Sequence, residues 1–465
     1  MEVLLLAQIR SNTKQSAESF ERAKNVIPGG VTANIKDISP HPIFMEKGKG
    51  SKLYDVDGNE YIDYLLCYGS LILGHGHPKV IEAATKQMKD AGTTIFGTPH
   101  RLETTMAEKL ISLYPGIEMV RYTNSGLEAT LLAIRLAMAF TGKSKLAKFE
   151  GHYHGGYDQV LLSVNPDEQR AGQTDQPNAV PESRGIPDYY IENTIILPFN
   201  DLAATEKILR ARAHEISSII MEPVQGGFIP ADRQFMSGIR QVTEELGILL
   251  IFDEVKTGFR LSLGGAQQLY GIKPDLTALG KVLGGGFPVG AIGGKKKIME
   301  ISAPDGGRDI LTAGAENADK QDALFHSGTY NGHPTVLASG LATIEVLEQD
   351  GTMEKLIADT MQFRKELEKL YRRYDYPMQT IGEGSIFNII LAEGNIKNYR
   401  DMNKADTHFR KELDYELIEQ GIYTKPLNRY SMSVTHTEED IEHTIHAHEK
   451  AIKLVLHKRS AVKGI

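Results

Sequence analysis

Short apolar runs alternate with amphipathic segments through the middle of the chain. Residues 146–149, 216–221 and 248–252 are rich in apolar side chains, whereas 235–246 repeats them at helical spacing before Gly247, a typical helix C-cap. Buried strands that alternate with helices are typical of parallel βαβ units, in which helices cover both faces of the sheet. The sequence therefore predicts an α/β fold.

Composition and charge exclude several other classes of protein. The chain has 465 residues, 41% of them hydrophobic, which is enough for a large core in roughly two to three domains. Its net charge of −8 offers no basic field for nucleic acid or an acidic membrane. A single cysteine, Cys67, excludes an internal disulfide. Because the first residues lack the features of a signal peptide or membrane span, we expect a cytoplasmic protein.

Further elements are expected towards both ends of the chain. The patterns predict a helix over 16–30, a pair of strands within 52–66 around an Asp/Gly turn, and a helix over 102–113. Residues 165–187 show neither periodicity, and a polar stretch of this length is either an active-site loop or disordered, of which we favour the loop. From about residue 331 helices alternate with short strands, which indicates a smaller C-terminal domain.

Charged residues follow the predicted strands. Asp253 and Glu254 come directly after the run that ends at residue 252, and Lys281 follows the apolar segment 275–280. Because ligands of parallel sheets lie at the carboxyl ends of strands, we expect these side chains to face a site. A lysine after a buried strand is costly unless it is paired, nucleophilic or covalently bonded, and the glycines at 284–286 permit close backbone approach. Asp253 alone fits a helix cap equally well; its occurrence with Lys281 favours a site.

An anion site is expected around residues 124–128. This segment stands between a strand-like run and a strongly helical one, so that free amides and the helix dipole can bind a phosphate there. A simple N-cap by Ser125 explains the motif equally well. Tyr153, in the sequence Gly-His-Tyr-His-Gly, offers an aromatic face on which a ring can stack.

Together and in this order, these motifs resemble those of class III aminotransferases of fold type I. The similarity is to the subgroup of glutamate-1-semialdehyde aminomutase and its aminotransferase relatives. Matching stretches run from 28–30 to 327–329, and the most specific are 252–255 with its lysine partner, 124–126 and 151–155.

The resemblance implies both the architecture and the cofactor. It implies a large domain over 76–335 with a mostly parallel, seven-stranded sheet covered by helices, and a smaller α+β domain from 1–75 and 336–465. Lys281 carries pyridoxal 5′-phosphate as a Schiff base and later moves a proton. Asp253 pairs with the pyridinium nitrogen and keeps it protonated.

The same resemblance assigns roles to other positions. Val255 and Tyr153 hold the ring from opposite faces, and Glu222 lies at another strand end beside it. Thr329 reaches the phosphate from the neighbouring subunit, which implies a homodimer with shared active sites. The backbone groups that bind the phosphate belong to Ser125, Gly126 and Leu127, with Leu127 standing where the family usually has threonine.

Departures from the aminomutase pattern concern the substrate. Lys36 stands where the aminomutases have an arginine that binds the substrate carboxylate, and lysine cannot form the two-pronged contact of arginine. Tyr68 replaces their tryptophan, and the loop after His154 is longer and more polar than theirs. Arg429 is a candidate second carboxylate ligand, although an ordinary surface arginine fits its position equally well.

We therefore expect an aminotransferase that works by ping-pong half-reactions. It takes an amino group from an α- or β-amino acid or related amine and gives it to a keto-acid or other carbonyl acceptor. The alternatives are a glutamate-1-semialdehyde 2,1-aminomutase and a pyridoxal-phosphate-dependent racemase or epimerase, because all three use the same lysine to move a proton.

Two other classes of protein are disfavoured. The histidines at 75, 77, 152 and 154 lie in Gly-rich turns without an HExxH helix or paired CxxC, so no metal is expected. Residues 141–144 resemble the end of a phosphate-binding P-loop, but the residues before them are helical and lack its first glycine.

Overall fold

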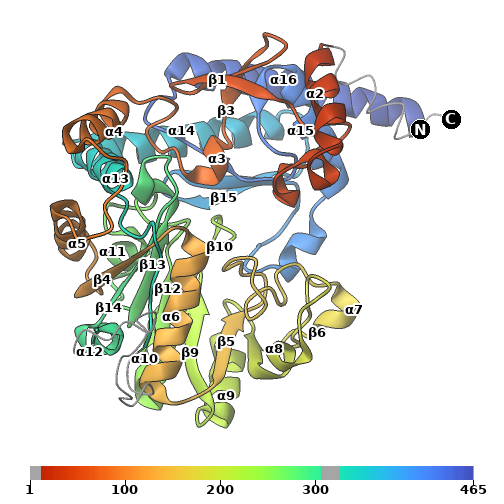
Figure 1. Ribbon diagram of the computed structural model, residues 1–465. Helices are drawn as coiled ribbons and strands as arrows, with labels where there is room; N and C mark the ends of the chain where they lie inside the picture. The colour runs from red at the N-terminus through yellow and green to blue at the C-terminus, as the bar shows by residue number, and fades with distance from the viewer. Residues whose placement is uncertain (1–11, 305–323, 464–465) are drawn as a thin grey trace. The chain divides into compact units, whose positions relative to one another are not determined.

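The computed structural model describes residues 12–304 and 324–463, which form two compact units (Figure 1). The large unit comprises Lys79–Met353 and Asn395–Asn403. The small unit comprises Met1–Pro78, Glu354–Gly394 and Lys404–Ile465. The domain boundaries expected near residues 75 and 335 stay a prediction.

A mostly parallel sheet forms the centre of the large unit, as the sequence predicts. Within the described residues it has seven strands in the order β4-β14-β13-β12-β9-β5-β8. Only β14 runs against its neighbours, β13 and β4. The strands are β4 (Met119–Thr123), β5 (Lys145–Phe149), β8 (Thr194–Leu197), β9 (Ile216–Met221), β12 (Leu249–Asp253), β13 (Leu276–Gly280) and β14 (Gly290–Gly294).

Helices cover the sheet, and this explains why every residue of β9, β12 and β13 is buried. The long helix α6 (Gly126–Thr141) crosses one face and packs on β13, β14 and β9, while α10 (Arg233–Leu246) packs on β12 (Figure 1). Each Leu or Ile buried in this way contributes roughly 1.5–3 kcal/mol. The predicted helix over 235–246 is confirmed as α10, and Gly247 caps it in the left-handed conformation.

Shorter elements complete the large unit. The predicted loop 165–187 contains a turn of helix and a two-stranded hairpin, so it is more structured than its lack of periodicity indicates. The predicted helix over 102–113 is confirmed as α5. The elements are α4 (Pro78–Ala91), α5 (Arg101–Leu113), α7 (Glu168–Ala171), β6 (Gly172–Gln173), β7 (Gln176–Pro177), α8 (Asp188–Asn193), α9 (Leu202–Arg212), β10 (Val224–Gln225), β11 (Ile229–Pro230), α11 (Gly265–Tyr270), η3 (Lys281–Gly284), α12 (Lys296–Met299) and α13 (Pro334–Leu347).

The small unit combines helices with two sheets of order β1-β2-β3-β17 and β15-β16-β18. The rings of Tyr64, Phe363, Phe387 and Tyr430 pack together in its core. Its elements are α2 (Lys14–Lys24), η1 (Pro28–Gly30), η2 (Asn34–Lys36), β1 (Met45–Lys49), β2 (Lys52–Asp55), β3 (Glu60–Asp63), α3 (Leu66–Gly69), α14 (Thr352–Arg372), β15 (Gln379–Glu383), β16 (Ile386–Ile390), η5 (Arg400–Lys404, shared with the large unit), α15 (Thr407–Glu419), β17 (Ile422–Tyr423), β18 (Tyr430–Ser431) and α16 (Glu438–Lys463).

The first helix of the small unit differs from its predicted range of 16–30. It ends at Lys24, and Pro28–Gly30 form a separate turn. The sequence placed the helix stop at Pro28–Gly30, and these residues do lie outside the helix, although its last helical residue comes earlier than the apolar pattern indicates. The strand pair predicted within 52–66 is confirmed as β2 and β3. Across the described residues, we find no helix with the length and apolar character needed to traverse a membrane.

A buried charge network at the start of β13 provides a test of this packing. Asp275 is 4% exposed and pairs with Arg240 of α10 (3.0 Å) and Lys295 after β14 (2.6 Å). Because Asp275→Ala leaves Arg240 without this carboxylate, we expect it to lower the unfolding free energy by about 3 kcal/mol in denaturant titrations. The control Glu300→Ala breaks an exposed 3.6 Å pair with Lys296 and should cost less than about 0.5 kcal/mol. Equal losses in the two variants would contradict the prediction.

Candidate active site at the carboxyl edge of the sheet

Adjacent parallel strands bring Glu222, Asp253 and Lys281 to one edge of the large unit's sheet. Glu222 follows β9, Asp253 is the last residue of β12, and Lys281 follows β13. Since β12 pairs in parallel with both β9 and β13, their carboxyl ends lie side by side. The structure thus gathers at one edge the residues that the sequence singled out at strand ends.

Asp253 is buried and bonded through both carboxylate oxygens. Its Oδ1 accepts the amide of Val255 at 3.0 Å, and its Oδ2 lies 2.7 Å from Nδ1 of the buried His154. Hydrogen bonds are electrostatically stronger in such a water-poor environment than in solvent. The edge of the sheet therefore holds a fixed carboxylate at its centre.

Glu254 does not face this edge, contrary to the sequence prediction. Its carboxylate accepts the amides of Ala266 (2.7 Å) and Gln267 (3.1 Å) inside the fold, and burial raises its pKa to about 7. Successive side chains of an extended strand point to opposite sides, so Asp253 and Glu254 cannot both face the same site.

Lys281 begins η3 with a φ of +48°. This left-handed conformation costs a residue with a side chain of order 1–3 kcal/mol and persists where its surroundings impose it, often at functional sites. The close approach predicted at the glycines 284–286 is seen at Gly285, where the neighbour is α13, and an approach to a cofactor there stays a prediction. A Cβ on Gly285 would lie 2.6 Å from Oγ1 of Thr343 in α13, so this turn packs on a helix.

Other glycines bring the backbone close together beside Lys281. A Cβ on Gly126 would lie 2.6 Å from Cγ1 of Val255, and one on Gly290 would lie 2.1 Å from the carbonyl oxygen of Ser125. A Cβ on Gly280 would meet the Cα of Gly126 at 3.4 Å. At Gly126 and Gly290, only glycine lets β14, the turn after β12 and the start of α6 approach this closely.

The amino end of α6 lies next to Val255, two residues after Asp253. Ser125 caps the helix, because its Oγ accepts the amide of Glu128 at 3.2 Å, so the capping interpretation is confirmed. The first amides of a helix, here those of Gly126 and Leu127, have no acceptor within the helix, and the helix dipole makes this end positive. Capping and anion binding are therefore compatible, and phosphate binding here stays a prediction.

Glu222 links Tyr153 to a lysine that the sequence did not single out. One carboxylate oxygen, Oε2, accepts the amide of Tyr153 at 2.9 Å, and the other pairs with Nζ of Lys256. Nζ of Lys256 also lies 5.5 Å from the centre of the Tyr153 ring. Although burial alone raises the pKa of Glu222, the neighbouring cation of Lys256 lowers it to about 2.

Lys148 underlies the loop that carries Tyr153 and His154. It is completely buried in β5, and its Nζ donates to the carbonyl of Leu162 at 2.5 Å and to that of Phe149 at 3.4 Å. These bonds join the two ends of the loop. Burial lowers the pKa of Lys148 to about 7.

Arg400 fixes the longer loop 165–187. Its guanidinium pairs with Glu150 at 2.7 Å and donates to the carbonyl of Gly172 at 2.8 Å. Glu150 directly follows β5 and precedes the loop of Tyr153. The arginine therefore connects the segment 395–403 to both loops of the large unit.

Thr329 lies in the exposed segment that leads to α13. Close by in sequence, Asn331 accepts a hydrogen bond at 3.1 Å from Asn124, immediately before the α6 cap. The segment is thus tied to the predicted phosphate region of its own chain. A contact of Thr329 with the neighbouring subunit's phosphate stays a prediction.

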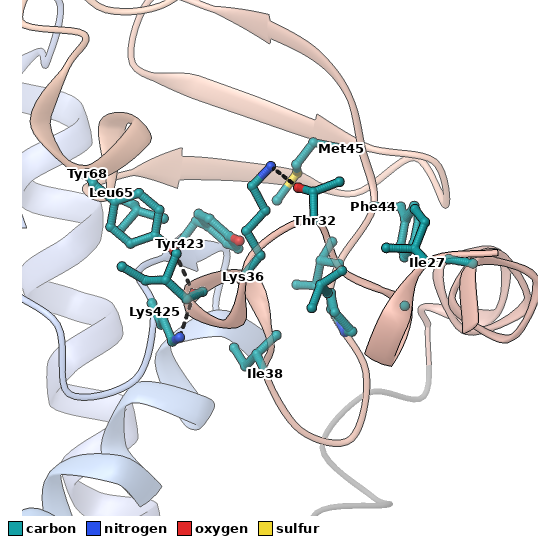
Figure 2. Close-up of a pocket in the computed structure, with 16 residues that line it drawn as sticks. Ile27, Thr32, Lys36, Ile38, Phe44, Met45, Leu65, Tyr68, Tyr423 and Lys425 are labelled. Carbon is teal, nitrogen blue, oxygen red and sulfur yellow. Dashed lines mark hydrogen bonds between the residues drawn. The ribbon is translucent and has the colours of Figure 1, made fainter. Parts of the chain in front are cut away.

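The predicted substrate residues lie in the small unit. Lys36 and Tyr68 line a cavity of about 400 Å³ (Figure 2). Nζ of Lys36 donates to Oγ1 of Thr32 at 2.9 Å, and the hydroxyl of Tyr68 donates to the carbonyl of Ile35 at 2.7 Å. Tyr68 belongs to α3, which has positive φ angles at consecutive non-glycine residues, a strain of the kind often retained at functional sites.

Arg429 lies near this cavity without being one of its lining residues. Its Nη2 donates to the carbonyl of Tyr68 at 3.2 Å. Lys425, which the sequence did not single out, lines the cavity and donates to the carbonyl of Ile35 at 2.5 Å (Figure 2). Burial lowers the pKa of Lys425. The small unit thus adds a second lysine beside Lys36.

The histidines considered as metal ligands serve other contacts. Nε2 of His75 lies 2.7 Å from Asp63, and His154 is bonded to Asp253. Burial holds the pKa of His152 well below its ordinary value, so its neutral ring accepts the amide of Glu222 at 3.0 Å. These bonds account for His75, His152 and His154 as structural groups.

Comparison with known proteins agrees with this geometry. The profile of the family Aminotransferase class-III matches residues 34–452. The chain is 40% identical over 447 residues to the glutamate-1-semialdehyde 2,1-aminomutase of Ignicoccus hospitalis, covering 95% of this chain and 99% of that protein.

Solved structures are similar over almost the whole chain. An omega-transaminase from Sphaerobacter thermophilus matches with a TM-score of 0.89 and 33% identity, covering 96% of this chain and 99% of that one. A transaminase with PLP bound matches with a TM-score of 0.85 and 30% identity, covering 96% and 99%. The chain belongs to the class III aminotransferases, enzymes of fold type I. Its cofactor is pyridoxal 5′-phosphate.

The residues at the sheet edge fit this cofactor. Asp253 matches a protonated ring nitrogen, the start of α6 matches a phosphate, and the ring of the 45% exposed Tyr153 offers a stacking face. Val255 packs on Gly126 at the start of α6, next to the region proposed for the phosphate. When bound, the cofactor withdraws electrons from the carbon that bears the substrate's amino group, which eases removal of a proton there.

The buried Lys148 of β5 allows a pH-dependent test of the packing beneath the loop of Tyr153. With a folded pKa of about 7, against 10.5 ordinarily, Lys148 binds fewer protons in the folded chain than in the unfolded chain between these values. The unfolding free energy should therefore rise with pH there, relative to Lys148→Met, by roughly 1 kcal/mol per pH unit.

Denaturant titrations between about pH 7 and about pH 9 measure this difference. The control Lys143→Met removes a half-buried lysine that donates to Ala213 at 2.8 Å, and its curve should run parallel to that of the unmodified protein. If the unfolding free energies of Lys148→Met and of the unmodified protein changed equally with pH, the prediction would be contradicted, because Lys148 would then be charged in the folded chain.

Proposed function

We propose that this enzyme moves an amino group between neighbouring carbons of one substrate, in the manner of a glutamate-1-semialdehyde 2,1-aminomutase. The observation that carries the proposal is the 40% identity with an aminomutase over almost the full length of both chains. The similarity favours the aminomutase alternative over the transfer between two substrates that the sequence motifs favoured. In this reaction the nitrogen on C2 of the amino aldehyde moves to C1 and gives 5-amino-4-oxopentanoate, an isomer of the substrate.

Lys281 is the proposed catalytic residue. Its amino group would hold the cofactor covalently, and as a free amine it would take a proton from C2, which bears the amino group, and deliver a proton to C1. Its place at the carboxyl end of β13, beside Asp253 on β12, supports this role. Asp253 would pair with the ring nitrogen, and its contacts with His154 and the Val255 amide hold its carboxylate at the end of β12.

The remaining cofactor contacts are proposed in the same way. Tyr153 and Val255 bracket the ring, and Glu222 orients Tyr153 through its amide. Phosphate binding is assigned to the backbone of Ser125, Gly126 and Leu127. Thr329 is assigned to the phosphate of a neighbouring subunit, and with it we propose a homodimer that shares its active sites.

Lys36 and Arg429 are proposed to recognise the carboxylate of the substrate. Both are cations near Tyr68 in the small unit, where Lys36 lines the cavity and Arg429 bonds the backbone of Tyr68. An amino aldehyde with a side-chain carboxylate and a dicarboxylic donor both present the anion that such cations attract. Tyr68 is proposed to shape the apolar part of the same surface.

Transfer between two separate substrates is the second candidate. Lys36 favours it, because the lysine stands where the aminomutases have arginine, and so does the 33% identity with an omega-transaminase. Racemisation of an amino acid is a third candidate, since it uses the same lysine without net movement of nitrogen.

The proposal predicts that glutamate 1-semialdehyde isomerises without any added amino donor or keto acid. Holoenzyme and substrate alone should give one 5-amino-4-oxopentanoate for each substrate consumed, measured by NMR, because no nitrogen enters or leaves. Lys281→Ala should give no product above the uncatalysed background.

The other candidates give different results in matched reactions. No isomerisation, together with nitrogen transfer from an amino acid to a keto acid, would replace the proposal by the transaminase. Inversion of a chiral amino acid without either change would establish the racemase.

A further inference from the structure

Lys256 lies beside Tyr153, the aromatic residue that is proposed to stack on the cofactor. It directly follows Val255 on the turn after β12, and its side chain is only 14% exposed. From there its Nζ reaches the carboxylate of Glu222, which is 2% exposed, and lies 5.5 Å from the centre of the Tyr153 ring. A lysine with so little contact with water loses hydration that only close partners compensate.

The contacts of Lys256 and Glu222 converge on Tyr153. Glu222 accepts the backbone amide of Tyr153 at 2.9 Å, while the ammonium group of Lys256 lies beside its ring. A cation at this distance from an aromatic ring attracts its face, and more strongly where water is excluded. The backbone and the ring of Tyr153 are thus held by the two members of one ion pair.

The orientation of Tyr153 needs such support. Tyr153 is 45% exposed, so packing against other side chains restrains it only in part. On the other side of the loop, His154 is bonded to Asp253 and fixes the backbone directly after Tyr153. The ammonium group of Lys256 is a contact made with the ring itself.

We propose that Lys256 is a positioning residue that, together with Glu222, holds the Tyr153 ring in the orientation that receives the cofactor. The inference rests on the proposed stacking of Tyr153 on the cofactor and does not depend on which amino-transfer reaction the enzyme performs. It predicts that loss of Lys256 weakens cofactor binding through Tyr153.

The test measures the dissociation constant of pyridoxal 5′-phosphate by absorbance titration of the full-length protein freed of cofactor. Lys256→Met should raise this constant about tenfold, and Lys256→Arg, which keeps a cation for both partners, should restore it to within about threefold. As a matched control, Lys297→Met removes a lysine that lies 5.6 Å from the Phe140 ring away from the site, and should leave the constant unchanged.

Double variants separate positioning from simple charge compensation. Lys256→Met leaves Glu222 buried without its cation, and adding Glu222→Gln removes that charge. We expect the double variant to bind the cofactor as weakly as Lys256→Met, because the ring contact is still missing. Recovery of unmodified affinity would overturn the proposal, since Lys256 would then serve only to neutralise Glu222.

A second double-variant cycle tests whether Lys256 affects cofactor binding through the Tyr153 ring. In a Tyr153→Leu background, Lys256→Met should change the dissociation constant by less than about threefold, because there is no ring left to orient. The same tenfold loss in both backgrounds would overturn the proposal. If Tyr153→Leu itself leaves the affinity unchanged, the stacking assumption fails, while the isomerisation assay still tests the proposed function separately.

Discussion

The buried contact between Asp253 and His154 holds the active-site edge together. Asp253 ends a strand whose residues are all buried, and a carboxylate in such a place costs several kcal/mol unless hydrogen bonds compensate it. His154 and the amide of Val255 provide them, and both belong to loops that follow strands of the sheet. One bond therefore fixes the anion of β12 and the loop of β5 at the same time.

The backbone places positive charge close to the Asp253 carboxylate. The positive end of α6 lies where Gly126 packs directly on Val255, two residues from Asp253. Lys281 follows the neighbouring strand in a strained left-handed conformation. A cofactor with a cationic ring nitrogen and an anionic phosphate matches this separation of charge. Glycine packing is what makes it possible, because any side chain at Gly126 or Gly290 would force the elements apart.

Much of this arrangement is predictable from sequence, because it depends on local periodicity and on strand ends. The sheet strands around Asp253 and Lys281 and the helix α10 follow from apolar spacing alone. Contacts between residues far apart in sequence leave no local pattern, so Lys256, Lys148 and Arg400 were not predicted. Glu254 was assigned to the wrong side of its strand, although the alternation of side chains could have excluded it. The glycines at 284–286 predicted a close backbone approach, but the neighbour of Gly285, helix α13, could not be predicted because a run of glycine does not reveal what it packs on.

Covalent mapping of the cofactor tests the central claim most directly. Borohydride reduction of the holoenzyme fixes the cofactor to the lysine that holds it, and peptide mass spectrometry then identifies that residue. We expect the modification on Lys281, which follows β13 beside Asp253. Modification of Lys256 or Lys148, both near the same edge and close to Glu222, would contradict this account of the site.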